Sequence, residues 1–355
     1  MRPEWNDTGE HREEEVPSAP IDRLLAASVA RRFYLGHQSK VDIAREFNIS
    51  RFKVARLLEA AVAHNIVRIG ITVPAEIDVP LSQALAESFG LRHAVVVNLT
   101  RSEGGVVASD DTRQVSHWLG TAAAQLISDI AEERDVLGLD GSPPVQALSE
   151  AVTRLPSCEV VQLTGVHGQD LATDPAVAAV RRTAKAGGGR AFPLCTPFIL
   201  PDAPTAAILR SQPAIAETLN RFGRVTKAVV GIGAWDATLS AVYDDLPEPE
   251  RERYRALGAC AEVVGHVFDQ AGDLITTELN ARMISMGTAE LLDVPELIGL
   301  AGGAGRAEAV RAVLNSGLLT GVVTDTTTAR RLLWSDGREI TPRTADTPYV
   351  TETSV

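Results

Sequence analysis

The sequence contains few cysteines and no long hydrophobic run, and each absence excludes a class of protein. Three cysteines occur among 355 residues: Cys158, Cys195 and Cys260. Because they are odd in number and far apart, they argue against a disulfide framework and against zinc-ligand spacing, and they fit a reducing cytosol. No apolar run approaches the ~20 residues that a helix needs to cross a bilayer. The first twenty residues hold the charged stretch EHREEE and no apolar core of a signal peptide. We therefore expect a cytoplasmic protein without a membrane partner.

The sequence also lacks the motifs of several enzyme classes. It contains no P-loop, no nucleophile elbow and no HExxH motif. An isomerase needs an acid and a base close to one sugar carbon, yet His93, His117, His167 and His266 are scattered along the chain. Only His167 falls in an expected strand-end loop. We predict no catalytic residue, no cofactor and no bound metal.

Positive charge is scarce overall but concentrated near the N-terminus. The formal net charge is -12 at pH 7, and residues 22–73 nevertheless contain nine basic and four acidic side chains. Residues 1–21 contain two basic and six acidic side chains, and residues 74–355 have a net charge of -13. A small basic segment on an acidic body indicates that only this segment meets a polyanion.

Composition and periodicity divide the chain into four parts. Residues 1–20 are rich in proline and acidic side chains and are predicted to be a disordered arm. Residues 21–74 form the basic domain, and residues 75–335 form a large α/β domain. The large domain alternates apolar strands, glycine-rich turns and amphipathic helices, which is typical of a doubly wound, Rossmann-like sheet. Residues 336–355 lack periodicity and are predicted to be a flexible tail.

The basic domain has the layout of a winged helix-turn-helix. Ser39 and Asp42 are expected to form a reciprocal capping box at the start of one short helix. Ser50 is expected to cap a second, longer helix, with Asn48 in the turn between them. Alternating Ile and Val in residues 65–73 predict a strand or wing. The residues expected on the buried side of the second helix are Val54, Leu57, Leu58 and Val62.

The basic side chains of this domain fit contacts to DNA. The N-terminal turn of the second helix enters the major groove in such a motif, so Arg51 can bind a guanine edge and Ser50 a phosphate. Lys40 lies where a phosphate contact is expected. The alternative is a solvated basic face, which the two caps, the turn and the wing disfavour. Phe52 can contact a thymine methyl or pack between helices, and packing is favoured. The predicted DNA-binding residues are Ser39, Lys40, Ser50, Arg51, Lys53 and Arg56.

The segment DIAREFNISRFKVARLLEAAVAHNIVRIGI resembles the DNA-binding domain of the SorC family of sugar-responsive bacterial repressors and activators. Residues 258–333, which include GACAE and VTDTTTA, resemble the C-terminal half of that family's sugar-binding domain. Together the similar segments span about residues 22–335. The resemblance implies a large domain of the sugar-phosphate isomerase fold that binds an effector and mediates oligomerisation.

The implied function is that of a transcriptional regulator with three kinds of partner. These are a double-stranded DNA operator, a small sugar, sugar phosphate or polyol effector, and further copies of the chain in a dimer or tetramer. The alternative function is a sugar-phosphate isomerase-like enzyme with an appended basic domain.

Four expected strand-end loops are candidates for binding the effector, because glycine there lets backbone amides approach a phosphate. They span residues 138–142, 164–168, 231–233 and 302–306. We expect the Ser142 hydroxyl to donate to a phosphate oxygen. The predicted effector-binding residues are Gly138, Asp140, Gly141, Ser142, Thr164, Gly165, Gly231, Gly233, Glu262, Gly302, Gly303, Arg306 and Asp325.

Two of these residues have alternative roles. Arg306 stands where the family usually has lysine, and we expect it to bind an anion; a surface ion pair with Glu308 is the alternative. Asp325 is expected either to accept hydrogen bonds from sugar hydroxyls or to cap the following helix.

The chain departs from the family pattern at two acidic positions. The family's aromatic residue in W-G-x-T is replaced by Asp140, and Glu262 stands where Asp is usual. A carboxylate at the mouth of the pocket disfavours a highly anionic ligand. We therefore expect a polyol or a singly phosphorylated sugar as effector, and not a bisphosphate.

Overall fold

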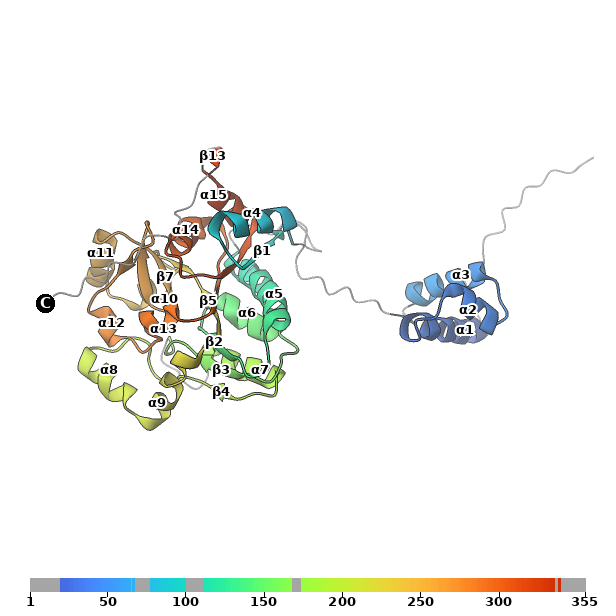
Figure 1. Ribbon diagram of the computed structural model, residues 1–355, viewed down its shortest axis with the longest axis horizontal. Coiled ribbons are helices and arrows are strands. Elements are labelled where there is room, and N and C mark those ends of the chain that lie inside the picture. Colours follow the sequence, from blue (N-terminus) through green and yellow to red (C-terminus); the bar gives the residue numbers. More distant parts are fainter. Residues whose placement is uncertain are drawn as a thin grey trace, which may run out of the picture. The chain divides into compact units, whose positions relative to one another are not determined.

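The computed structural model describes residues 20–64, 66–67, 77–99, 111–167, 174–335 and 338–339. The chain divides into two compact units, residues 1–73 and 74–355, which are described separately (Figure 1). The expected arm, wing and tail lie almost wholly outside the described residues. Within the described residues, no helix is long and apolar enough to cross a membrane.

The first unit is helical. Its elements are α1 (Pro20–Ala30), the π-helix η1 (Arg31–Leu35), α2 (Lys40–Glu46) and α3 (Arg51–Ala63). Val29, Ile43 and Val54 come from three different helices and are fully buried in one small core. An ion pair of 2.8 Å between Arg32 and Glu46 connects η1 to α2. Tertiary packing of apolar faces therefore holds these short helices together.

The predicted starts of α2 and α3 are confirmed. The Ser39 hydroxyl accepts a hydrogen bond from the Asp42 amide at 3.2 Å, and the Ser50 hydroxyl accepts one from the Lys53 amide at 3.1 Å. Asn48 has a φ of 52°, the left-handed conformation expected in the turn. The second hydrogen bond predicted for this capping box, from the Ser39 amide to the Asp42 carboxylate, is not formed. The carboxylate accepts from the Ser39 hydroxyl instead.

Two burial predictions for α3 are also wrong. Val62 is 41% exposed, because Ala61 continues the buried stripe in its place. Phe52 is 68% exposed and does not pack between helices. Its ring lies under the Arg51 guanidinium, at 5.0 Å between the guanidinium carbon and the ring centroid.

The second unit is built on a seven-stranded parallel sheet, which confirms the predicted α/β class. The sheet order is β1-β11-β10-β5-β2-β3-β4, and every neighbouring pair is parallel. The strands in that order are β1 (His93–Val97), β11 (Gly321–Asp325), β10 (Glu296–Leu300), β5 (Lys227–Gly231), β2 (Val136–Leu139), β3 (Glu159–Gln162) and β4 (Ala191–Phe192).

The direction in which the chain crosses the sheet reverses between β2 and β5. From β2 the chain proceeds to β3 and β4 on one side, and β5 then returns to the other side of β2, followed by β10 and β11. In open α/β sheets ligands bind beyond the carboxyl ends of the strands at such a switch point. The ends of β2 and β5 are therefore the place to look for an effector site.

Helices cover both faces of the sheet (Figure 1). On one face α5 (Thr112–Ile130), α6 (Pro143–Ala151) and α7 (Pro175–Ala186) pack against a core that includes Leu119, Leu148 and Val180. On the other face α4 (Val79–Phe89), α14 (Ala307–Asn315) and α15 (Thr326–Leu333) contribute to a second core with Leu85, Val313 and Leu332. The continuous apolar strands fit this burial on both faces.

A second sheet, which the strand pattern does not predict, lies after β5. It is antiparallel, in the order β6 (Gly233–Ala234), β7 (Ala259–Val263), β8 (His266–Asp269) and β9 (Leu274–Ile275). The second unit also contains the short helices α8 (Ala203–Arg210), α9 (Pro213–Leu219), α10 (Ala241–Asp245), α11 (Glu248–Ala256), α12 (Leu279–Arg282) and α13 (Thr288–Leu292). The remaining elements are η3 (Phe222–Arg224), η4 (Ala304–Arg306), β12 (Trp334–Ser335) and β13 (Arg338–Glu339).

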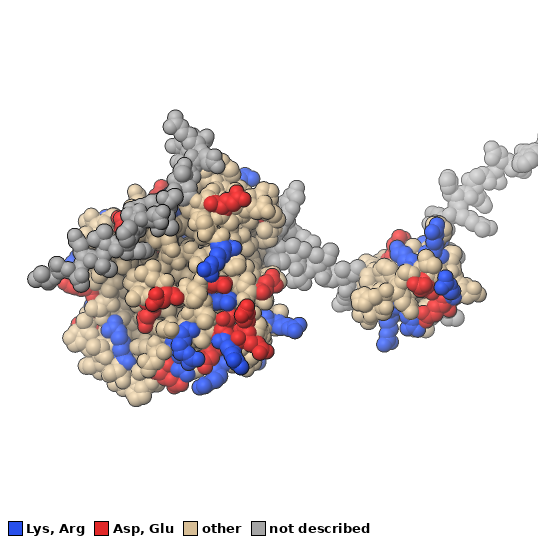
Figure 2. Space-filling view, in the orientation of Figure 1, with Lys and Arg blue, Asp and Glu red and all other residues tan. Residues whose placement is uncertain are grey.

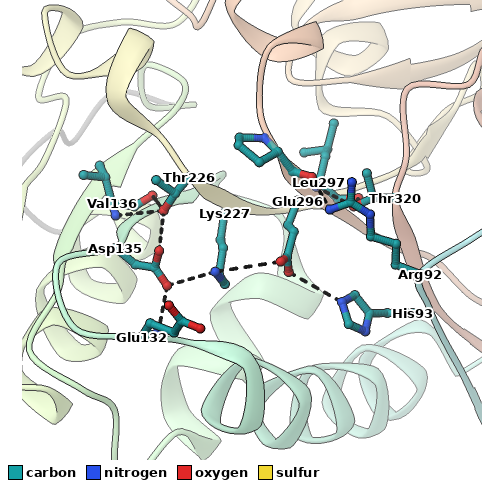
Figure 3. A network of polar contacts seen from close by, with 11 residues as sticks. Arg92, His93, Glu132, Asp135, Val136, Thr226, Lys227, Glu296, Leu297 and Thr320 are labelled. Carbon is teal, nitrogen blue, oxygen red and sulfur yellow. Dashed lines mark hydrogen bonds and ion pairs between the residues drawn. The ribbon is translucent and has the colours of Figure 1, made fainter.

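A network of polar contacts lies at the amino ends of the parallel strands (Figure 3). The switch-point loops lie at the opposite, carboxyl ends of these strands. The Lys227 ammonium is only 8% exposed and lies 3.0 Å from Asp135 and 3.9 Å from Glu296. Burial alone would raise the pKa of Asp135, but hydrogen bonds from the Glu132 amide and the Thr226 hydroxyl, together with Lys227, lower it below its usual value. The network therefore stabilises the ionised carboxylate.

Candidate functional site

The N-terminal turn of α3 presents polar and basic side chains to solvent. Ser50, Arg51, Lys53 and Arg56 are all exposed, and Ser50 caps the helix. Figure 2 shows lysine and arginine side chains on the visible face of this unit, with fewer acidic ones among them. An exposed helix N-terminus with several cations can bind phosphates and base edges.

Lys40 occupies the start of the preceding helix and is also exposed. Its ammonium lies 5.8 Å from the centroid of the Phe33 ring. The cap residue Ser39 is exposed beside it. The six predicted DNA-binding residues therefore all lie on the surface of the first unit, five at the N-terminal ends of α2 and α3 and Arg56 one turn further along α3.

In the second unit, Asp140 lies at the switch point and bridges the ends of β2 and β5. One of its oxygens accepts from the Ser142 amide at 3.0 Å and the Ser142 hydroxyl at 2.7 Å. The other accepts from the Gly231 amide at 2.7 Å. Burial raises the pKa of Asp140, while these hydrogen bonds act in the opposite direction. The Ser142 hydroxyl, which we expect to donate to a phosphate oxygen, donates to Asp140 in this structure.

Glu262 reaches the same region from the second sheet. Its strand β7 pairs with β6, which directly follows β5, and Glu262 stands opposite Gly233. Its carboxylate accepts from the Gly265 amide at 2.7 Å and from the Ser240 hydroxyl at 3.3 Å. A Cβ atom at position 233 would lie 2.9 Å from the carboxylate, so glycine leaves the space that Glu262 fills. Burial raises the pKa of Glu262.

His167 pairs with Asp245 near these carboxylates. The distance between its Nδ1 atom and the Asp245 carboxylate is 2.6 Å, and its ring stands edge-on to Phe198. Burial alone would lower the pKa of His167, but the hydrogen bond and charge of Asp245, with Glu262 and Asp174 nearby, raise it above its usual value. The acidic environment of His167 therefore favours its protonated form.

Arg306 is the arginine of the loop after β10 and is half-buried. Its guanidinium donates to the carbonyl of Gly302 at 3.3 Å. Among the described residues no ion pair to Glu308 or to another carboxylate is formed, so the surface ion pair is not the role that the structure shows. Burial lowers the pKa of Arg306.

Asp325 is a helix cap, which was one of its two expected roles. It is 1% exposed, and its carboxylate accepts from the amides of Thr327 and Thr328 at the start of α15. It also accepts from the Gly303 amide at 2.6 Å and from the Thr328 hydroxyl at 2.8 Å. Its oxygens accept from these four donors, so the carboxylate fastens the start of α15 to the loop after β10.

The glycines of the four loops mainly allow close packing. A Cβ atom at Gly138 would lie 2.7 Å from the Leu163 side chain, and one at Gly302 would lie 2.6 Å from Asp325. The Gly165 amide donates to the Ile284 carbonyl at 2.7 Å, and the Gly141 carbonyl accepts from Gln146. The amides of Gly165, Gly231 and Gly303 thus already donate to the protein, contrary to the expectation that they are free for a phosphate.

Thr164 has a buried hydroxyl group whose hydrogen-bonding capacity is not used by the described residues. It is 4% exposed, and its hydroxyl has no hydrogen-bond partner among the described residues. The Trp235 indole nitrogen, in a side chain that is 7% exposed, also has none there. The part of the chain that the structure describes contains no cluster of histidine, cysteine and carboxylate side chains that could hold a metal ion.

Comparison with known proteins places this architecture in a family. The family described as "Putative sugar-binding domain" matches residues 73–334, which is most of the chain. The chain belongs to this family. The same domain is found in SorC-type transcriptional regulators, which agrees with the resemblance in the sequence.

Curated relatives of this sugar-binding family share about a quarter of their residues with the chain. The erythritol catabolism regulatory protein EryD of Brucella abortus is 28% identical over 323 residues, covering 89% of this chain and 98% of EryD. The transcriptional regulator LsrR of an Enterobacter species is 27% identical, covering 89% and 94%. These relatives are transcriptional regulators, and they support a regulator over the enzyme alternative.

Solved structures share the fold. The full-length sorbitol operon regulator SorC of Klebsiella pneumoniae superposes with a TM-score of 0.64 at 21% identity, covering 88% of this chain and 99% of that protein. A domain of a possible sugar-binding regulator from Arthrobacter aurescens gives 0.63 at 22% identity, covering 74% and 99%.

Sequence reasoning missed part of the switch-point site. Asp245 and Ser240 belong to the short segment around α10, which carries no strand or helix signal strong enough to predict. His167 was noted only as a lone loop histidine. Its partner lies 78 residues further along the chain, a separation that no local pattern reveals.

Proposed function

We propose that this protein is a sequence-specific transcriptional regulator whose operator binding is modulated by a small sugar, sugar phosphate or polyol. The observation that carries the proposal is the combination, in one chain, of a capped helix-turn-helix with an exposed basic turn and a sugar-binding domain. The acidic second unit is unsuited to coating DNA, so binding falls to the first unit.

In the first unit we assign different roles to the basic residues. Arg51 reads a guanine edge, and Phe52 contacts a thymine methyl, since both side chains project from the first turn of α3. Lys40 and Ser50 bind phosphates, which sets the position of the helix on the duplex. Lys53 and Arg56 extend the same surface.

In the second unit the effector binds at the switch point. Glu262 accepts hydrogen bonds from its hydroxyl groups, Arg306 and the Thr164 hydroxyl donate to its oxygens, and the His167–Asp245 pair lines the acidic side. Asp140 and the loop glycines shape the site. The names of two similar proteins, an erythritol catabolism regulator and a sorbitol operon regulator, refer to polyols and support this class of effector.

Regulation requires the effector to bind one arrangement of the DNA-binding units better than another. Operators of helix-turn-helix proteins are commonly two-fold repeats, so the active form is a dimer or tetramer in the cytoplasm.

A binding titration and a turnover assay together test the proposal. Fluorescence anisotropy with DNA from the gene's own upstream region should show specific binding that exceeds binding to a random duplex. Incubation with pentose and hexose phosphates should show no conversion. Turnover without specific DNA binding would contradict the proposal.

A further inference from the structure

The switch point between β2 and β5 already contains an acceptor of hydrogen bonds, the carboxyl group of Asp140. The carboxyl ends of these two strands are the position at which open α/β sheets bind ligands. Asp140 follows β2 directly, is 6% exposed, and accepts a hydrogen bond from Gly231 at the end of β5. Its side chain therefore spans the crevice between the two strand ends.

The groups that hold Asp140 are those that would otherwise bind a phosphate. They are two backbone amides, one from each strand end, and the Ser142 hydroxyl at the start of α6. An amide faces each carboxylate oxygen, so both oxygens act as acceptors, as in an ionised carboxylate. A Cβ atom at position 231 would approach the Ser142 hydroxyl to 2.6 Å, so glycine is needed for this close packing.

We propose that the carboxylate of Asp140 occupies the hydrogen-bond donors at the switch point that a phosphate would need, so that the effector is an unphosphorylated polyol or sugar. This inference rests on the proposed function, because it assigns the chemical class of the ligand at the same site.

The neighbouring charges act in the same direction. Glu262 reaches the strand ends through β7, and Asp245 lies beside His167, so carboxylates outnumber the single imidazole there. A phosphate placed among them would meet like charges and find its amide donors already used. Neutral hydroxyl groups can donate to the remaining lone pairs of Glu262.

Arg306 does not reverse this preference. It belongs to the loop after β10, and its guanidinium donates to the Gly302 carbonyl of the same loop. A guanidinium can donate to the oxygens of neutral hydroxyls as well as to anions. In this assignment Arg306 orients the polyol, and no phosphate is required.

A gain of phosphate binding tests the role of Asp140 without knowledge of the natural effector. In Asp140→Ala the three donors become free, and inorganic phosphate should raise the Tm of the variant in a dose-dependent manner. The wild-type protein should show no such rise. Circular dichroism before heating establishes that the variant is folded.

The matched control is Asp202→Ala. Asp202 caps α8 and likewise accepts from a backbone amide, that of Thr205 at 2.7 Å, but among the described residues no strand end contributes a donor there. This variant should gain no phosphate binding. If phosphate raised the Tm of both variants equally, the effect would reflect a general loss of negative charge, and the proposal would be overturned. A folded Asp140→Ala variant whose Tm does not respond to phosphate would also overturn it.

A ligand panel tests the selectivity of the site in the intact protein. Calorimetry with erythritol, sorbitol and their monophosphates should show that the wild-type chain binds the free polyol at least about tenfold more tightly, equivalent to about 1.4 kcal/mol. Asp140→Asn, which keeps the shape and removes the charge, should reduce this discrimination and serves as the second variant if Asp140→Ala does not fold. Tighter binding of a monophosphate by the wild type would overturn the inference while leaving the proposed regulator intact. Absence of operator binding would instead contradict the proposed function.

Discussion

Arg51 and Lys40 lie on the same surface of the first unit but are expected to affect DNA binding differently. Arg51→Ala should relax the preference for the operator by about 1–3 kcal/mol, because a base contact is lost. Lys40→Ala should weaken binding to all duplexes and reduce the slope of log K against log salt by about 0.9, because one phosphate contact is lost. Anisotropy titrations on specific and random duplexes at several salt concentrations measure both effects.

The exposed Lys185 at the end of α7 provides the control for these variants. Lys185→Ala removes one positive charge from the second unit and should leave both the affinity and the salt slope unchanged. Equal losses on specific and random duplexes for Arg51→Ala would remove this residue from base readout.

A substitution of Asp325 tests whether its buried carboxylate stabilises the fold or contacts the ligand. Asp325→Ala leaves the amides of Gly303, Thr327 and Thr328 unpaired and should lower the free energy of unfolding by about 1–3 kcal/mol. Urea unfolding measures this loss. Calorimetry on the folded variant should find polyol affinity nearly unchanged. Unchanged stability with lost polyol binding would show that Asp325 contacts the ligand.

At this scale, sequence predicts what is local. The caps Ser39 and Ser50 and the turn residue Asn48 follow from contacts within three residues, and all three are observed. The hydrogen bond from Gly231 to Asp140 joins residues 91 positions apart, so sequence could flag Asp140 as unusual but could not show which donors it uses. The prediction that Phe52 packs between helices is wrong because its ring lies on the exposed face of α3, beside the Arg51 guanidinium.

Among the structural elements, the amino ends of the parallel strands depend on one buried ammonium group (Figure 3). Lys227→Met leaves Asp135 and Glu296 without their shared cation and should destabilise the protein by about 3–5 kcal/mol at neutral pH. Lys185→Met, at an exposed position, should have little effect. Urea unfolding of both variants makes the comparison.

The pH dependence of this loss follows from the lowered pKa of Asp135. A carboxyl whose pKa is lower in the folded than in the unfolded state stabilises the protein above its unfolded pKa, near about 3.9. This stabilisation is lost as the pH falls through the folded pKa. The difference between wild type and Lys227→Met should therefore be largest near neutral pH and shrink in acid. An equal difference at pH 7 and at pH 3 would rule out the ion pair as its cause.

The parallel sheet can be predicted from the alternation of apolar strands and amphipathic helices, because each of these strands and helices shows a clear periodicity in the sequence. The antiparallel sheet was not predicted, since β6 and β9 contain two residues each and carry no periodicity. That sheet brings Glu262 to the strand ends, so part of the effector site depends on an element that is set by tertiary packing alone.

In the whole molecule, the basic first unit, which has the helix-turn-helix, and the acidic second unit, which has the sugar-binding domain, belong to one chain. Charge and the capped helices predict the DNA-binding role of the first unit, and the resemblance to the SorC family implies the effector-binding role of the second; the comparisons support both. How effector binding changes operator affinity is a property of the assembly. A coupling free energy of about 1–3 kcal/mol, a change of roughly 5–150-fold in affinity, is typical of such regulation.

The most direct test of the account is operator affinity at low ionic strength with and without an unphosphorylated polyol. We predict that the purified protein binds DNA from its own upstream region, and that a polyol that binds the second unit changes this affinity at least about fivefold. The same polyol should leave binding to a random duplex unchanged. Failure to bind the upstream DNA, in the absence and in the presence of every polyol and sugar tested, would contradict the account.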